Sequence, residues 1–103
     1  MERIYFDNAA TTPIDERVIE VMVDSLRHTN GNPSSIHQEG RTARAAIEQA
    51  RRQIARSLNA SIGEIFFTSG GTESSNMALK RSVQDLGVQR IISSRTEHHC
   101  VLH

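Results

Sequence analysis

Apolar residues along the chain alternate between helical and strand-like spacing. Across residues 13–27, apolar side chains recur at steps of three and four, the spacing of an amphipathic helix. Thr12 is expected to cap this helix. A longer helix is predicted over residues 36–58, with Ser35 and Gln38 as a capping box at its start. The first half of the chain is therefore predicted to be helical.

Two short apolar runs in the second half have the composition of strands. Residues 64–68 and 90–94 are rich in Ile and Phe, which favour extended structure. Between them, helical spacing returns from Thr72 to about Leu86, and Gly87 is expected to end this third helix. Two strands of about five residues do not make a stable sheet by themselves, so we expect other strands to complete it.

The turn between the first predicted strand and the third helix has the chemistry of a phosphate site. Gly70 and Gly71 allow a sharp turn and a close approach of the backbone to a ligand. The helix start then offers unpaired N–H groups and about half a positive charge. The hydroxyls of Ser69, Thr72 and Ser74 add donors. At this point a phosphate-binding turn and an ordinary capped turn both remain open.

Common nucleotide motifs are missing around these glycines. No Lys follows them as in GxxxxGK[ST], and the GxGxxG pattern is also absent. A nucleotide is therefore disfavoured as the source of the phosphate.

Composition and charge exclude several further classes of function. Lys plus Arg and Asp plus Glu both number 12 in the 103 residues, which disfavours a nucleic-acid or membrane surface. No apolar run approaches the roughly 20 residues of a membrane span, and residues 1–15 hold no signal-peptide apolar region. The single cysteine, Cys100, excludes an internal disulfide, and we expect a cytoplasmic protein.

The last predicted segment carries three of the five histidines. His99 and His103 lie four residues apart, the spacing of a helical metal pair with Cys100 or Glu97, although no CxxC or HExxH pattern supports this. Alternatively, His98 lies near the phosphate turn and stacks on a planar ligand or handles a proton. A third interpretation is that these histidines only start a helix.

Four segments taken together resemble the cysteine desulfurases of the NifS/IscS type, in the class V aminotransferase group. The resemblance runs the full length of the chain, in the same order and with similar spacing. The segments are Tyr5-Phe6-Asp7-Asn8-Ala9-Ala10-Thr11-Thr12-Pro13, Gly31-Asn32-Pro33-Ser34-Ser35-Ile36-His37, Phe67-Thr68-Ser69-Gly70-Gly71-Thr72-Glu73-Ser74 and Thr96-Glu97-His98-His99-Cys100-Val101-Leu102.

This resemblance implies pyridoxal 5′-phosphate as the cofactor. Gly71 and Thr72 match positions that bind its phosphate, and His98 matches the histidine that stacks on its ring and assists proton transfer. The resemblance also implies that a loop at the N-terminus borders the substrate site, formed by Asn8, Ala9 and Thr11.

The implied fold is α/β, a partial PLP-dependent transferase fold of type I. Residues 1–15 would form a segment and loop bordering the active site, and residues 16–60 the N-terminal helices. Residues 61–103 would begin the large, mainly parallel-sheet domain that binds the cofactor.

The implied activity converts L-cysteine to L-alanine and an enzyme-bound persulfide, for Fe–S cluster or thio-cofactor synthesis. Members are several times longer and need a Schiff-base Lys, a sulfur-accepting Cys and an Asp. Neither Lys80 nor Cys100 matches those positions, so we expect an N-terminal fragment that is inactive alone.

The resemblance further implies a homodimer that delivers sulfur to an Fe–S scaffold or another acceptor protein. Selenocysteine lyase, and a non-catalytic module that binds phosphate or metal, remain as alternatives.

Overall fold

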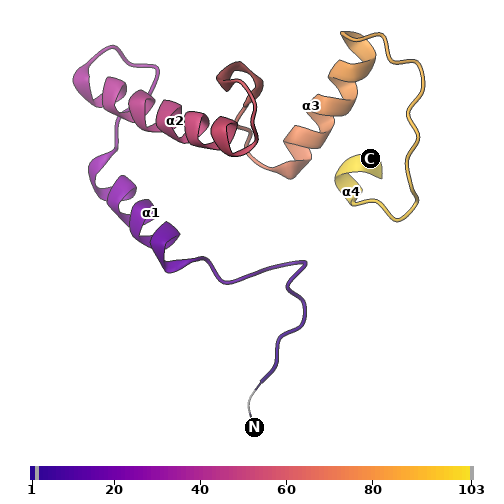
Figure 1. Ribbon diagram of the computed structural model, residues 1–103, viewed down its shortest axis with the longest axis horizontal. Coiled ribbons are helices and arrows are strands. Elements are labelled where there is room, and N and C mark those ends of the chain that lie inside the picture. Colours follow the sequence, from indigo (N-terminus) through magenta and orange to yellow (C-terminus); the bar gives the residue numbers. More distant parts are fainter. Residues whose placement is uncertain (2, 103) are drawn as a thin grey trace. The chain divides into compact units, whose positions relative to one another are not determined.

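The computed structural model describes Met1 and residues 3–102 (Figure 1). The chain divides into two compact units, Met1–Ala60 and Ser61–His103. The first unit contains helices α1 (Glu16–His28) and α2 (Gln38–Ser57). The second contains a short 3₁₀ turn, η1 (Ile62–Glu64), followed by α3 (Gly71–Gln84) and the short α4 (His99–Leu102).

Helix α1 begins later than its apolar pattern suggests. The carboxylate of Asp15 accepts the N–H of Arg17 at 2.9 Å and caps the helix, so the prediction of a Thr12 cap is wrong. Two further contacts join the Arg17 guanidinium to the same carboxylate, at 2.8 and 2.9 Å. Asp15 therefore accepts a backbone N–H of the first helical turn and also pairs with the Arg17 cation. Thr12, farther from the helix along the chain, does neither.

Helix α2 starts at Gln38, and its cap is not the predicted box of Ser35 and Gln38. Nδ1 of His37 accepts the N–H of Gly40 at 3.3 Å instead. Glu39 Oε2 lies 2.9 Å from the same nitrogen. The imidazole therefore takes the place of the expected hydroxyl, because Ser35 belongs to the preceding turn, where its N–H donates to Asn32.

The loop before α2 packs closely on the helix. The Nε of Arg44 donates to the carbonyl of Pro33 at 2.8 Å, and the Arg41 guanidinium donates to the carbonyl of Ile36. Both arginines thus bond the loop that precedes the helix. Gly40 is buried beneath the loop: a Cβ there would lie 2.5 Å from the carbonyl oxygen of Ser35 and 2.6 Å from that of Asn32. Only glycine permits this approach.

Helix α2 ends in a left-handed residue. Asn59 has φ +52°, and the next N–H, of Ala60, donates to the carbonyl of Ala55 at 2.9 Å. The N–H of Asn59 itself donates to the carbonyl of Arg56. This pair of bonds closes the helix as a Schellman motif with Asn in the position usually held by Gly.

The two predicted strands are absent from the described residues. Glu64 ends the 3₁₀ turn η1, and none of residues 65–68 and 90–94 is assigned to a helix or a strand. Ile65 nevertheless has extended angles, φ −102° and ψ 119°. Local composition thus favours extension, but a strand also requires the regular backbone bonds of a sheet, and no sheet forms among the described residues.

Helix α3 is the part of the second unit that the pattern predicts well. It starts at Gly71, one residue before the predicted Thr72, and ends at Gln84. Gly87 has φ +67°, and the N–H of Val88 reaches back to the carbonyl of Ser82 at 3.1 Å. The C-cap is Asp85, so the prediction that the helix runs to Leu86 with Gly87 as its cap is wrong by two residues. Gly87 instead supplies the left-handed conformation in the turn that follows the cap.

Among the described residues, only two apolar side chains are buried, those of Ala43 and Ala55. Large apolar side chains remain exposed on every helix of more than one turn, and no helix in the described part of the chain is long and apolar enough to cross a membrane. Because alanines bury little area, these contacts contribute little hydrophobic stabilisation. The most exposed large side chains include Leu26, Ile36, Phe6 and Ile92.

Candidate functional site

The glycine turn before α3 leaves the first amides of the helix uncapped by any side chain. Gly70 is the N-cap residue in extended conformation and, as a glycine, makes no side-chain cap bond; within the described residues no other side chain bonds the N–H of Gly71 or Thr72. A Cβ built on Gly70 or Gly71 would meet no atom within 4 Å. Open space and unpaired N–H groups therefore coincide at the positive end of a 14-residue helix.

Glu73 braces the turn from within the first helical turn. One carboxylate oxygen accepts the N–H of Ser69 at 2.8 Å and the Ser69 hydroxyl at 2.5 Å. The hydroxyl bond, and then the backbone bond, hold the pKa of the Glu73 carboxyl below its ordinary value, against a smaller opposing effect of desolvation. The carboxylate thus remains charged and fixes the residue that precedes Gly70.

A second brace crosses the same turn. The hydroxyls of Thr68 and Ser74 lie 2.5 Å apart, and both are within hydrogen-bond distance of the Gly70 carbonyl. The prediction that Ser69, Thr72 and Ser74 all add free donors is therefore wrong for Ser69 and Ser74. Their hydroxyls shape the turn instead, which leaves Thr72 as the hydroxyl of these three without such a bond in the described residues.

The turn fits the phosphate of pyridoxal 5′-phosphate. A phosphate is bound by backbone N–H groups at a helix start, and this requires uncapped amides with room in front of them. Gly71 and Thr72 are the first two residues of α3, and the space beside Gly71 is open, since a Cβ there would meet no atom within 4 Å. No arginine or lysine takes part in the braces of the turn, so the amides and the helix dipole would supply the attraction.

His98 lies immediately before α4 and begins it. Its carbonyl accepts the N–H groups of Val101 and Leu102, and its Nδ1 accepts the N–H of Cys100 at 3.3 Å. In the neutral ring the proton is consequently on Nε2, which faces away from this bond. The rings of His98 and His99 meet edge to face, with centroids 5.9 Å apart.

Asn76 joins the His98 segment to the helix that begins at the glycine turn. Its Nδ2 donates to the carbonyl of Thr72 at 3.0 Å and to the carbonyl of Cys100 at 3.5 Å. Nearby, the Cys100 thiol lies 3.7 Å from the Ser75 hydroxyl. Sequence reasoning missed Asn76, although an amide one helical turn after Thr72 was the available signal.

The remaining predicted site residues belong to the first unit. Asn8 and Ala9 lie in a turn closed by the N–H of Thr11, which donates to the carbonyl of Asp7 at 3.3 Å. The Tyr5 hydroxyl lies 2.7 Å from that of Thr11 and fixes the end of the turn. The loop is thus locally ordered, and its place beside the phosphate turn stays a prediction.

Lys80 and Cys100 do not match the family positions of the Schiff-base Lys and the sulfur-accepting Cys, and both lie in the second unit. Lys80 is exposed on α3, and the Cys100 thiol is half-buried beside Ser75. The alternative metal pair of His99 and His103 lies partly outside the described residues, because His103 is not among them. Within the described part of the chain, no three potential ligands gather around a common point.

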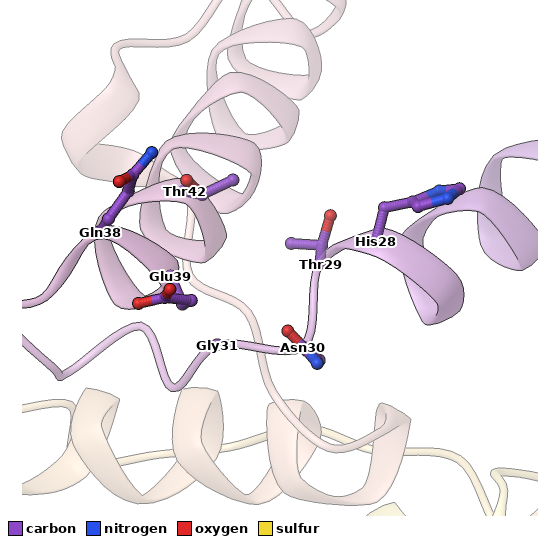
Figure 2. A pocket seen from close by; sticks show the side chains of 7 residues that line it. All are labelled: His28, Thr29, Asn30, Gly31, Gln38, Glu39 and Thr42. Carbon is purple, nitrogen blue, oxygen red and sulfur yellow. The ribbon is translucent and has the colours of Figure 1, made fainter.

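Hollows elsewhere on the two units contain none of the residues predicted to bind cofactor. In the first unit, a hollow of about 210 Å³ lies between the end of α1 and the start of α2 (Figure 2). In the second, a groove of about 460 Å³ runs between the extended residues 64–68 and one face of α3. Figure 2 labels the lining of the first, His28, Thr29, Asn30, Gly31, Gln38, Glu39 and Thr42.

Comparison with known proteins gives one family for nearly the whole chain. Residues 4–103 match the family model described as Aminotransferase class-V. The chain is 51% identical to a putative cysteine desulfurase, IscS 1, of Bacillus subtilis (strain 168), over all of its own length and 28% of the relative's.

Proteins of other organisms are also similar to this chain. The chain is 52% identical to the cysteine desulfurase IscS of Dictyoglomus turgidum, over 96% of its own length and 26% of the relative's. It is 43% identical to the mitochondrial cysteine desulfurase of Drosophila melanogaster, over 96% of its own length and 22% of the relative's. The chain thus spans about a quarter of the length of the curated relatives it matches.

Proposed function

The chain belongs to the class-V aminotransferase family, and on this basis we propose that the whole protein is a pyridoxal 5′-phosphate-dependent cysteine desulfurase of fold type I. It converts L-cysteine to L-alanine and retains the sulfur as an enzyme-bound persulfide. The names of the relatives in Bacillus, Dictyoglomus and Drosophila support this activity.

The observation that carries the proposal is the open glycine turn at the start of α3. The N–H groups of Gly71 and Thr72 bind the cofactor phosphate, with the dipole of α3 behind them. Glu73 and Ser74 take no part in binding, because their side chains bond within the turn. They keep the two amides directed outward.

His98 supplies the second contact with the cofactor. Its ring would stack on the pyridine ring, and Nε2 would hold or move a proton there, since Nδ1 is occupied by the Cys100 N–H. When bound, the cofactor acts as an electron sink for the substrate's α-carbon. Asn8, Ala9 and Thr11 border the substrate.

The covalent steps depend on residues outside this chain, namely a Schiff-base Lys and a persulfide-forming Cys. The 103-residue chain alone is therefore inactive. The whole protein acts as a cytoplasmic homodimer and passes sulfur to an Fe–S scaffold or another acceptor protein.

A matched pair of substitutions at Gly71 tests the phosphate site. Gly71→Ala keeps the N–H, and its Cβ meets no atom within 4 Å. Gly71→Pro removes the N–H, while proline suits the first position of a helix. In the whole protein, titration of the cofactor's visible absorbance should show unchanged affinity for Gly71→Ala. Gly71→Pro should bind on the order of tenfold more weakly, or worse, because a hydrogen bond to a charged group is lost.

Two alanine substitutions extend the test to the side chains. Thr72→Ala and His98→Ala should both weaken cofactor binding, and His28→Ala, an exposed histidine of the first unit, serves as the control. If the proline variant at Gly71 binds as well as the alanine variant and neither Thr72→Ala nor His98→Ala has an effect, the assignment of the site is wrong.

A further inference from the structure

A continuous series of hydrogen bonds leads from the phosphate turn to the imidazole of His98. It begins at the carbonyl of Thr72, which accepts the Asn76 amide at 3.0 Å. The same Nδ2 also donates to the carbonyl of Cys100, 3.5 Å away and 24 residues later in the chain. The N–H of Cys100 then donates to Nδ1 of His98 at 3.3 Å.

This series of hydrogen bonds lies where helices α3 and α4 pack together. Among the described residues, α3 and α4 are the two helices that pack against each other. Ser75, Asn76 and Cys100 are half-buried, while the residues of the glycine turn are exposed. Asn76 thus makes its contacts where solvent is partly excluded, and a hydrogen bond there contributes more than one in open water.

Two other sets of contacts of His98 and Cys100 do less to place α4 on α3 than the Asn76 amide. The bonds from the His98 carbonyl to Val101 and Leu102 are internal to the helix start. The contact of the Cys100 thiol with the Ser75 hydroxyl, at 3.7 Å, involves a weak donor. The Asn76 amide is the stronger polar link between α4 and the first turn of α3.

We propose that Asn76 is a positioning residue that sets the place of the His98 ring relative to the phosphate-binding amides of Gly71 and Thr72. The inference rests on the proposed function, since it assigns a role within the same cofactor site. Asn76 touches neither phosphate nor ring; it holds the Cys100 carbonyl, and the N–H of the same residue, on the other side of its Cα, orients the imidazole through Nδ1.

Substitution of Asn76 in the whole protein tests the inference. Asn76→Asp keeps the shape but places a carboxylate against two carbonyl oxygens, and Asn76→Ala removes the amide without adding charge. Gln84→Glu makes the same amide-to-acid change at an exposed position of α3 and is the control. The readouts are cofactor affinity and the circular dichroism of the bound cofactor's visible band, which reports how the ring is held.

Both Asn76 variants should lose most of the dichroic band, as His98→Ala should, and Gln84→Glu should keep it. Their cofactor affinity should fall by less than the roughly tenfold expected for Gly71→Pro, because the phosphate amides are intact. In a double-mutant cycle, Asn76→Ala combined with His98→Ala should be no worse than His98→Ala alone, since Asn76 acts through that ring.

The failures of the two proposals are distinguishable. If His98→Ala leaves both affinity and dichroism unchanged, the proposed cofactor site is wrong, and the inference is overturned with it. If His98→Ala alters the dichroism and Asn76→Ala does not, or if the two effects add in the cycle, the site stands and the positioning role of Asn76 is overturned.

Discussion

The two units of the chain differ in how far their packing is complete. Every buried residue of the described chain, namely Gly40, Ala43 and Ala55, belongs to the unit Met1–Ala60. The unit Ser61–His103 buries none, yet it contains both predicted strands and the candidate cofactor site. A helix satisfies its backbone groups internally, whereas a strand depends on neighbours. The helical unit is consequently the one that takes its predicted form.

The same difference explains how the candidate site is held. The glycine turn is braced by side chains within a few residues, Glu73 on Ser69 and Ser74 on Thr68. Local bonds of this kind need no completed sheet. The phosphate turn is therefore formed although the segment that leads into it belongs to no sheet among the described residues.

Hydrogen exchange provides the largest expected contrast between the units. In the 103-residue chain, amides within α2 should exchange measurably more slowly than those of residues 64–68 and 90–94, which bond to no neighbouring strand. In the whole protein, the two extended segments should become protected, because sheet partners are then available. Mass spectrometry of both proteins measures this. Persistent fast exchange of both segments in the whole protein would contradict the α/β fold proposed here.

The exposed apolar surface predicts that the 103-residue chain is unstable or self-associates. Side chains such as Leu26 and Ile92 would then be covered by other copies. Sedimentation and thermal unfolding measured over a range of concentrations test this. A cooperative unfolding transition of a monomer, independent of concentration, would show that the prediction is wrong.

Gly40 provides a sharper test of the first unit. Gly40→Val forces a side chain against the carbonyls of Ser35 and Asn32, which would lie 2.5 and 2.6 Å from its Cβ. In the whole protein we expect the free energy of unfolding to fall by on the order of 1–3 kcal/mol, as for other overpacked sites. Denaturant unfolding measures the change. Gly63→Ala is the control, because nothing lies within 4 Å of its Cβ; an equal loss there would refute the close packing of the loop.

The two left-handed residues allow a smaller comparison across the units. Gly87→Ala places a Cβ at φ +67°, which should cost about 1 kcal/mol. Asn59→Gly, at φ +52°, should be neutral or slightly stabilising, because glycine adopts this conformation freely. Thermal midpoints of the two whole-protein variants provide the measurement. A stabilising Gly87→Ala would mean that α3 continues past its observed end.

The smallest expected effect is a change in folding stability at acid pH. Because the pKa of Glu73 is lower in the folded state than its ordinary 4.5, the Ser69 bonds stabilise the fold above that value. This contribution is lost as the pH falls through the folded-state pKa. Glu73→Gln should therefore be less stable than the parent protein near neutral pH, and the difference should shrink below pH 4.5. Urea midpoints across this range measure it, with Glu97→Gln as the control; a difference that grows in acid would refute the brace.

Sequence alone determined the approximate extents of the three longer helices, the glycine turn and the family, but it placed the end of the third helix two residues too late. These features depend on neighbours within a few residues, where periodicity and φ preferences act. It did not determine which residue caps a helix: Asp15 and His37 act in place of Thr12 and Ser35, because side-chain reach decides between adjacent candidates.

Tertiary structure decided what distant residues do to one another. It placed Asn76 between Thr72 and Cys100, and it set Gly40 beneath a loop that begins eight residues earlier. It also formed no sheet from residues 64–68 and 90–94 in the described part of the chain, although their composition favours strands. The physical reason is common to all three: hydrogen bonds and close contacts between separated segments depend on where the backbone folds, which local preference does not specify.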